Sequence, residues 1–417
     1  MQRQIIPQSP NFAAGAAERR VDLDWVRIGA FGLLIFYHVG MLYVSWGFHI
    51  KSVHRITALE PLMLVLNPWR LELLFLVSGV ATRFMLRKCA PGRLLLSRST
   101  RLLIPLIFGM LVIVPPQSYF EVVERWNYAG GFVKFYTELY LGPPRQICEA
   151  GHCVILPTWN HLWFVVYLFV YSALLALALA GAPGLLRAIE RRLAPILSGP
   201  GLLIWPVLLL AAYRLILFPY FPMTNALLGD WYNHALYGTV FLFGYLFALD
   251  DGVAAAAQRL RWPALAVALF CYASFILWRA FHQDGGPVAE TLTLYSRFAY
   301  AVFQWCCIVA VLGFGRRWLT RDAPARAYLT EAVFPFYIMH QTAIIATDYA
   351  LHGLGLPAWG EAALTIAATA ASCALTYEVV RRIGWLRPLF GLKLAPRRLA
   401  HARADAAAPF VLSADRQ

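Results

Sequence analysis

Three histidines of this chain lie inside long apolar runs, where an ionisable side chain is costly to place. They are His38 in LLIFYHVGMLY, His161 in NHLWFVVY and His340 in PFYIMHQTA. A neutral imidazole can take a proton from a hydroxyl group near neutral pH, so each is a candidate general base. The alternative is that each histidine packs in the core and hydrogen-bonds to a neighbouring helix.

Arg27 shares a helical face with His38. The two residues are 11 positions apart, which places them about 20° apart around a helix and about 16 Å apart along it. Asp24 precedes Arg27 by three positions and can pair with it, which lowers the cost of burying the guanidinium. We therefore expect one stripe on this helix that leads from a cation to a candidate base.

Glu72 lies near the start of the next apolar run, in WRLELLFLVSGVATR. A carboxylate at the depth of His38 can hold the imidazole in one tautomer or raise its basicity, and we expect this role for Glu72. The alternative is an interface carboxylate that pairs with Arg70 or Arg55. Gly79 lies about 20° from Glu72 on the helical wheel, and we expect it to let another helix approach closely.

His161 and His340 are both expected to reach the depth of His38. The three histidines come from different helices, without the i, i+4 pairing or the clear carboxylate ligand of a metal site. We therefore expect no metal, and we expect a catalytic set of His38, Glu72, His161 and His340.

The elements that position these residues must span a membrane. Of the 417 residues, 60% belong to the apolar set and only 14% are charged, whereas soluble domains carry about 25% charged residues. Apolar segments of spanning length follow one another along the chain, at 23–46, 64–86, 102–118, 161–180, 202–219, 231–249, 263–281, 294–314, 332–351 and 361–380. The predicted fold is an all-α polytopic membrane bundle of about ten transmembrane helices.

The basic residues indicate how this bundle is oriented. The formal net charge is +14, and with a cytoplasmic N-terminus 26 of the 36 Lys and Arg residues fall in inner segments and only five in outer loops. This asymmetry follows the positive-inside rule and predicts that both termini are cytoplasmic, in a bacterial-type inner membrane. The surplus positive charge meets anionic lipid there, so no nucleic-acid partner is expected.

The chain is predicted to have one large domain with flanking segments. We expect a cytoplasmic N-terminal segment at 1–22, a transmembrane domain at 23–383 and a basic cytoplasmic tail at 384–417, disordered beyond 395. No cleavable signal peptide is expected, because the first apolar run is too long and too polar at its start.

One outer loop, 119–160, is long enough to fold over a site. It holds Cys148 and Cys153, which can form a disulfide in an oxidising compartment. The alternative is two free thiols, since bridges across short loops are often strained.

Several of these features resemble the acyltransferase 3 family of membrane acyltransferases, and the chain looks most like its glucan-modifying succinyltransferase branch. The resemblance covers about 21–395 and keeps the order of the family's motifs. These are Arg27-x10-His38 after Leu23-Asp24, LFLVSG at 74–79, Arg98-x-x-Arg101 before Leu102 and Pro105, HLWF at 161–164 and YIMH at 337–340.

The resemblance implies transfer of an acyl group from a cytoplasmic coenzyme A thioester to a hydroxyl of a carbohydrate or other acceptor. It implies that His38 is the catalytic histidine and that Arg27, Arg98 and Arg101 lie near the donor. No soluble hydrolase-like domain follows the spans, so we expect a stand-alone membrane form.

The residues are consistent with this chemistry on physical grounds. The phosphates of acyl-CoA cannot enter the bilayer and need a cationic inner rim, and Arg98 and Arg101 share a face at the inner end of the third span. The alternative is that these arginines only anchor the topology. The reactive arm of the donor would then extend outward past Arg27 to His38.

Two other classes of function are alternatives to acyl transfer. A multi-span transporter or flippase of a small polar or glycan-linked substrate would also use central charges such as Arg214, Arg297 and His340. No five-plus-five repeat is visible, which favours acyl transfer over transport. A non-catalytic scaffold does not explain a one-sided stripe of Arg27 and His38.

Overall fold

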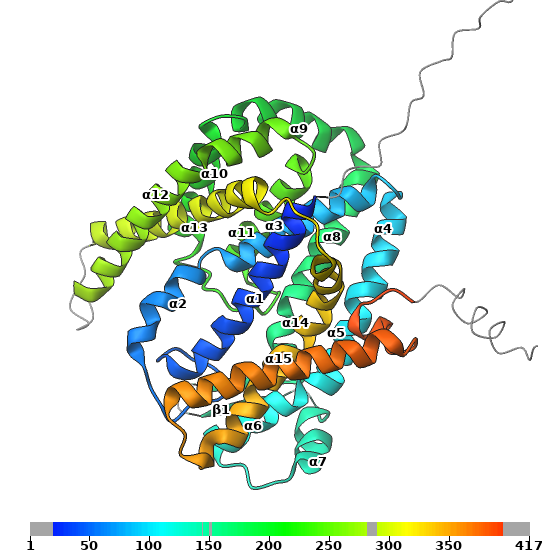
Figure 1. The fold of residues 1–417 in the computed structure, drawn as a ribbon, viewed down its shortest axis with the longest axis vertical. Coiled ribbons are helices and arrows are strands. Elements are labelled where there is room, and N and C mark those ends of the chain that lie inside the picture. The colour runs from blue at the N-terminus through cyan, green and yellow to red at the C-terminus, as the bar shows by residue number, and fades with distance from the viewer. Residues whose placement is uncertain (1–19, 144, 150–151, 282–289, 395–417) are drawn as a thin grey trace, which may run out of the picture.

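Helices form nearly all the regular structure of the computed structural model (Figure 1), which describes residues 20–143, 145–149, 152–281 and 290–394. The α-helices are α1 (Val21–Tyr43), α2 (Glu60–Leu66), α3 (Arg70–Leu86), α4 (Pro91–Arg98), α5 (Ile104–Phe108), α6 (Pro115–Trp126), α7 (Phe132–Lys134), α8 (Trp163–Gly181), α9 (Pro183–Leu197), α10 (Gly201–Ala212), α11 (Trp231–Phe247), α12 (Asp251–Phe281), α13 (Glu290–Trp318), α14 (Pro324–Leu351) and α15 (Ala358–Arg382).

Short 3₁₀ or π turns and one hairpin complete the described structure. They are η1 (Thr57–Leu59), η2 (Ser99–Leu103), η3 (Gly109–Ile113), η4 (Phe135–Tyr140), η5 (Asn160–Leu162), η6 (Tyr213–Leu217), η7 (His352–Leu354), η8 (Pro388–Phe390), β1 (Arg145–Glu149) and β2 (His152–Leu156). The predicted disordered tail beyond 395 and most of the predicted segment 1–22 lie outside the described residues.

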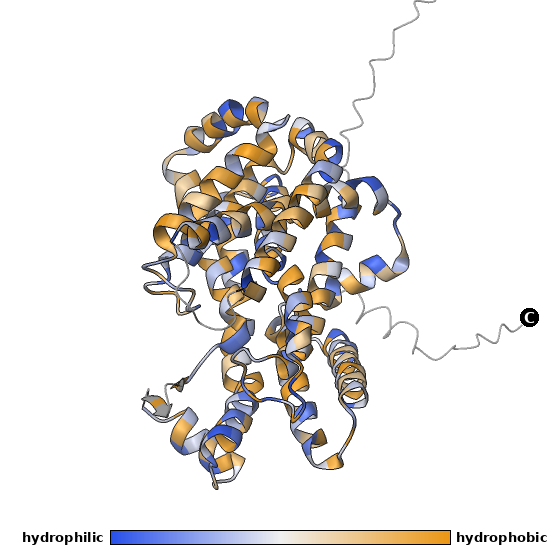
Figure 2. Ribbon diagram, turned by 90° about the vertical axis from the view of Figure 1, so that its left-hand side faces the viewer, coloured by the Kyte–Doolittle hydropathy of each residue, from blue (hydrophilic) through white to orange (hydrophobic). Residues whose placement is uncertain are grey.

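Seven helical segments of the described chain are long and apolar enough to cross a membrane, and hydrophobic residues dominate them (Figure 2). The segments are Val21–Tyr43, Thr57–Leu86, Pro91–Trp126, Asn160–Gly181, Asp251–Phe281, Glu290–Trp318 and Ala358–Arg382. A bent pair, Pro183–Leu197 with Gly201–Leu217, makes an eighth if its two arms form one broken span, with a bend of 117°. The multi-pass helical membrane architecture is therefore confirmed.

The predicted number of ten spans is not reached by this criterion. The predicted spans 231–249 and 332–351 fall on α11, which has 17 residues, and on α14, which buries His340, Gln341 and Asp348. Neither helix is among the seven. The helix α11 is too short, and the polar residues of α14 lower its mean hydropathy. The count of ten and the sides of the termini stay predictions.

The third spanning segment, α4 to α6, is interrupted by two π turns. Pro105 lacks the N–H that would bond the carbonyl of Arg101 in a regular helix, and the wide turn η2 ends two residues earlier. Pro115 and Pro116 have the same effect after η3. The first of these turns carries Arg101, so the irregularity lies at one of the predicted site residues.

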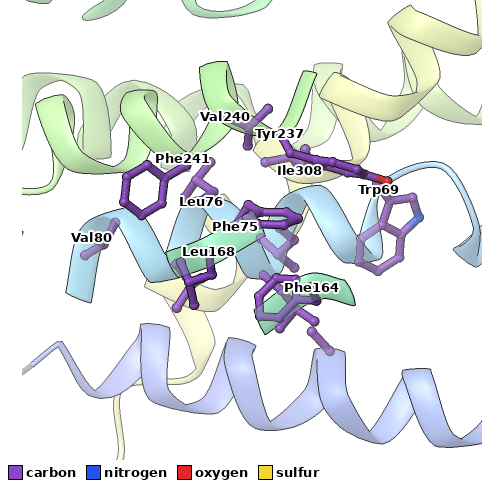
Figure 3. Packing of buried hydrophobic residues seen from close by; sticks show 14 of the residues in the cluster. Trp69, Phe75, Leu76, Val80, Phe164, Leu168, Tyr237, Val240, Phe241 and Ile308 are labelled. Atoms are coloured by element: carbon purple, nitrogen blue, oxygen red, sulfur yellow. The ribbon is translucent and has the colours of Figure 1, made fainter. Parts of the chain in front are cut away.

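The centre of the bundle is an aromatic and aliphatic core around α3 (Figure 3). The Phe75 ring is fully buried, with its centroid 4.4 Å from that of Phe164 and 4.7 Å from that of Tyr237. A Cβ added to Gly79 would overlap the carbonyl of Phe241 on α11, and one added to Gly244 would overlap the carbonyl of Leu76. Glycine thus allows α3 and α11 to touch backbone to backbone, as predicted for Gly79.

The predicted outer loop 119–160 is a folded unit with a core of its own. Val122, Phe135, Tyr140, Val154 and Leu156 are buried together. The Tyr140 hydroxyl donates to the carbonyl of Met110 over 2.7 Å, which ties this unit to the third spanning segment.

The hairpin of this unit carries the two predicted partner cysteines. Cys148 and Cys153 are directly opposed across the antiparallel pair β1–β2. Cys153 is disulfide-bonded, as the predicted pair requires. Free thiols are present elsewhere in the described chain, at Cys89, Cys271, Cys306, Cys307 and Cys373.

Candidate active site

Two of the three predicted histidines form a hydrogen-bonded pair. His38 on α1 and His340 on α14 lie with Nδ1 of the first 2.8 Å from Nε2 of the second. Their rings are nearly parallel, at 9° with centroids 5.0 Å apart. His340 is completely buried and His38 half-buried, so the pair has one closed end and one more open end.

The backbone of α14 sets the tautomers of this pair. His340 Nδ1 lies 2.6 Å from the carbonyl oxygen of Tyr337, and since a carbonyl only accepts, Nδ1 of His340 must carry a proton. In a neutral ring Nε2 of His340 is then the acceptor, and Nδ1–H of His38 is the donor. The remaining nitrogen of a neutral His38, Nε2, therefore carries a lone pair and can act as a base.

His161 lies against this pair but uses both of its ring nitrogens. Its ring is perpendicular to that of His340, with centroids 5.2 Å apart. Nε2 donates to the carbonyl of Ile338 over 3.1 Å, and Nδ1 is the acceptor 3.4 Å from Nε2 of Gln117. The Tyr337 hydroxyl donates to the His161 backbone carbonyl. His161 thus links α14 to the start of α8.

A buried amide network that the sequence analysis missed supports the histidines. Gln117 Nε2 donates to Thr342 Oγ1 over 2.6 Å, and Gln117 Oε1 accepts from Asn160 and from Gln341, each over 3.1 Å. Gln117 and Gln341 are buried polar residues in apolar runs. The rule that selected the histidines, that polar side chains in a span are costly and rare, also selects these two glutamines.

Glu72 lies in a different polar cluster from the one predicted for it. Its Oε1 accepts from Gln304 Nε2 over 2.8 Å, while its buried Oε2 meets no hydrogen-bond partner among the described residues. The partner of the His38 imidazole is His340 instead. Arg70 stacks on Tyr37, the neighbour of His38, with Cζ 3.4 Å from the ring centroid.

The three predicted donor-side arginines line one cavity of about 690 Å³, which we call the basic cavity. Arg27 reaches it from α1, whereas Arg98 and Arg101 reach it from α4 and η2, which follow each other directly in the sequence. Further cations at its wall come from the last part of the described chain, namely Arg381, Arg387 and Lys393.

Asp24 lies beside this cavity and contacts two arginines. Its Oδ1 is 3.9 Å from Nη2 of Arg27, so the predicted ion pair is present at a long distance. Its Oδ2 accepts from Arg326 over 2.5 Å, so the tighter partner is on α14. Arg27 Nη2 also donates to the carbonyl of Thr330 over 3.3 Å.

The charges around the basic cavity do not balance. Glu331 is the only acid among its described lining residues, and it is already paired with Arg387 over 2.8 Å. Arg98 donates to Thr82 Oγ1 over 2.6 Å and Arg101 to the carbonyl of Gly391 over 3.3 Å. Within the described chain neither guanidinium has an acidic partner, so an anion in the cavity would meet uncompensated positive charge.

A smaller apolar cavity of about 170 Å³ lies between α1 and α14 and adjoins the basic cavity. Phe31 and Val333 line both cavities. The apolar cavity extends along α1 and α14 to Tyr337 and His340. The two cavities therefore share part of their walls, and the apolar one reaches His340 of the histidine pair.

The chain matches the model of a known protein family. A family model described as an acyltransferase domain matches residues 20–378, which include all seven predicted site residues. No curated protein and no solved structure matches the chain.

Proposed function

The chain belongs to the acyltransferase 3 family and is a membrane acyltransferase, and on that premise we propose that it transfers an acyl group of the succinyl or acetyl class from acyl-CoA to a hydroxyl of a carbohydrate. A glucan-like compound is the proposed acceptor, and a bacterial-type inner membrane is the proposed location. His38 is the proposed general base.

The observation that carries this proposal is the hydrogen-bond chain from the Tyr337 carbonyl through His340 to His38. It leaves the lone pair on Nε2 of a neutral His38, at the end of the pair that is not fully buried. Acyl transfer to a hydroxyl needs a base that takes the hydroxyl proton as the oxygen attacks. A histidine whose other nitrogen is held by a fixed acceptor meets that need.

The reaction proposed at this base is a direct transfer. The acceptor hydroxyl gives its proton to His38 Nε2 while its oxygen attacks the thioester carbonyl. The carbon–sulfur bond then breaks, and the leaving thiolate takes the proton from His38. The products are the ester and free coenzyme A, and the histidine returns to its neutral form.

The two adjoining cavities support the proposed path of the donor. Arg98 and Arg101 in the basic cavity suit the nucleotide phosphates, since charge-assisted hydrogen bonds to phosphate are among the strongest in proteins. The apolar cavity between α1 and α14 suits the pantetheine arm and leads toward His340. Arg27 lines the basic cavity one helical turn before Phe31, which lines both cavities.

The other members of the predicted catalytic set receive different roles in this proposal. His340 positions His38 by accepting its Nδ1–H. His161 supports α14, because neither of its nitrogens is free to act as a base. Glu72 and the outer loop 119–160 are proposed to select the acceptor from the opposite side of the membrane.

The experiment that tests the proposal is an assay of the purified full-length protein in lipid nanodiscs. Succinyl-CoA or acetyl-CoA is supplied with a β-linked gluco-oligosaccharide, and both thiol release and the mass of the oligosaccharide are measured. We expect the two products to appear together and to depend on His38, with His38→Ala inactive at normal abundance.

The matched control is His54→Ala. The ring of His54 also makes a hydrogen bond, from Nε2 to the carbonyl of Leu356, but His54 lies outside the site. Full activity of the His38→Ala protein would contradict the proposal. Release of thiol while none of the tested acceptors becomes acylated would contradict it as well.

A further inference from the structure

The chain does not leave the bundle after its last long helix. Residues 384–394 turn back and lie beside α5 (Figure 1), where Phe390 and Leu392 are 5% and 6% exposed. The Phe390 ring packs on Phe108 with centroids 5.3 Å apart. This stretch, which we call the return segment, was expected to begin the basic tail, and it lies beyond residue 378, where the family match ends.

Arg387 holds the return segment in place. Its Nη2 pairs with Glu331 over 2.8 Å, its Nη1 donates to the carbonyl of Arg381 over 2.9 Å and its Nε donates to the carbonyl of Lys393 over 2.6 Å. The guanidinium therefore ties α14, the end of α15 and the end of the segment to one another. Such a fork of donors is specific to arginine.

Gly391 brings the return segment against the cavity wall. Its φ of +69° is a conformation that side-chain-bearing residues rarely adopt, and an added Cβ would overlap the ring of Phe334. The Gly391 carbonyl accepts from Arg101 Nε over 3.3 Å. The segment thus contributes a contact that orients one of the unpaired arginines of the basic cavity.

This arrangement places the cation Lys393 at the wall of two cavities. It lines both the basic cavity and a neighbouring cavity of about 620 Å³, whose wall also carries Arg20, Arg87 and Lys88. Its side chain is exposed, and it has no acidic partner within the described residues. Lys393 therefore lies at the junction of two basic hollows with its charge uncompensated.

We propose that the return segment is part of the donor site, in which Lys393 binds a phosphate of the coenzyme A nucleotide and Gly391 positions Arg101 for the same task. This inference rests on the proposed function. A thioester donor carries its phosphates at the nucleotide end and none on the pantetheine arm, so the role of Lys393 depends on the nucleotide alone.

The test compares two donors of the same acyl group in the full-length protein in nanodiscs. Lys393→Ala should raise the KM for succinyl-CoA about tenfold, the effect of losing one charge-assisted hydrogen bond, with kcat unchanged. With S-succinyl-pantetheine, which lacks the phosphates, the variant and the parent protein should have equal KM. Lys393→Arg should restore most of the affinity for succinyl-CoA.

Arg382→Ala is the matched control, because Arg382 is an exposed cation of the same region that pairs with Glu378 and lines neither cavity. A chain that stops after Leu394 should also keep the parent KM. Equal KM of parent and Lys393→Ala for succinyl-CoA would overturn the inference and leave the proposed function intact. If the parent protein consumes neither donor, the proposed function itself fails.

Discussion

His38 and His340 are 302 residues apart in the chain, and their ring nitrogens Nδ1 and Nε2 lie 2.8 Å apart. The second histidine is bound in turn to the carbonyl of Tyr337 one turn earlier on its own helix. The orientation of the His38 ring, and the nitrogen that it leaves free, therefore depend on how α1 packs against α14. The activity of His38 as a base is therefore expected to depend on His340.

We expect His340→Ala to lower kcat about ten- to a hundredfold, the range seen when a residue that orients a functional histidine is removed. The donor KM should change little, because the proposed phosphate contacts are made in the basic cavity, which His340 does not line. His340→Gln should retain more activity, since its amide oxygen can still accept from His38. Steady-state kinetics with varied acyl-CoA would measure both constants.

His38→Ala should cost about a hundredfold or more in kcat, the usual contribution of a general base. Adding His340→Ala to it should cost little further, because the second residue acts only through the first. A double variant whose loss equals the product of the two single losses would contradict the relay.

For Arg98→Ala and Arg101→Ala we expect the donor KM to rise about tenfold each, with kcat close to that of the parent, because each loses a phosphate contact. Arg259→Ala serves as the control, since this exposed arginine only donates to the carbonyl of Ser198. An unchanged donor KM in both variants would indicate that these arginines only anchor the topology.

Gly79→Ala should destabilise the protein by about 1–3 kcal/mol, the usual cost of overpacking a tight contact. The added methyl group would overlap the carbonyl of Phe241, and backbone has little room to yield. Thermal unfolding in detergent, followed by intrinsic fluorescence, would show a lower midpoint. Gly29→Ala is the matched control, because nothing lies within 4 Å of its added Cβ. Equal midpoints for the two variants would show that α3 and α11 do not touch at Gly79.

Lys51, in the connection between α1 and η1, should lose its proton at an unusually low pH. Its Nζ donates to the carbonyls of Met41 and Val44 over 2.6 and 2.8 Å. The pKa of Lys51 is lowered from 10.5 to about 8, mainly by burial, and repulsion from Arg55 and Arg125 contributes in the same direction. Mass spectrometry of amine labelling across a pH series would give the midpoint directly.

The sign of the associated stability effect follows from that pKa. Between about pH 8 and 10.5 the unfolded chain holds the Lys51 proton and the folded chain has released it, so this residue makes stability rise with pH in that window. Arg55→Gln should raise the pKa of Lys51, because one repulsive charge is gone. A midpoint that falls in Arg55→Gln would contradict this account.

The predicted orientation can be tested with two exposed positions. Ala90→Cys, after α3, should react with a membrane-impermeant maleimide only after the cells are permeabilised. Val133→Cys on α7, where the side chain is 75% exposed, should react in intact cells. Labelling of position 90 in intact cells would reverse the donor and acceptor sides.

Local sequence patterns predicted a large part of this protein. Composition predicted a helical membrane protein, because only spanning helices absorb so much apolar sequence. The rarity of charge in a span selected His38 and His340, and the helical period placed Arg27 on the face of His38. The small side chain of Gly79 indicated a close helix contact, and the structure shows it.

The partners of these residues could not be predicted in the same way. Glu72 was expected at His38, yet it bonds to Gln304. Residues 384–394 were expected to be tail, yet Arg387 and residues 391–394 line the basic cavity. Helical periodicity tells which residues share a face of one helix, but it carries no information on which helix that face meets. In a bilayer the lipid is as apolar as the helix surfaces, so burial does not choose neighbours. Side-chain packing and hydrogen bonds between distant segments make that choice, and they exist only in the folded bundle.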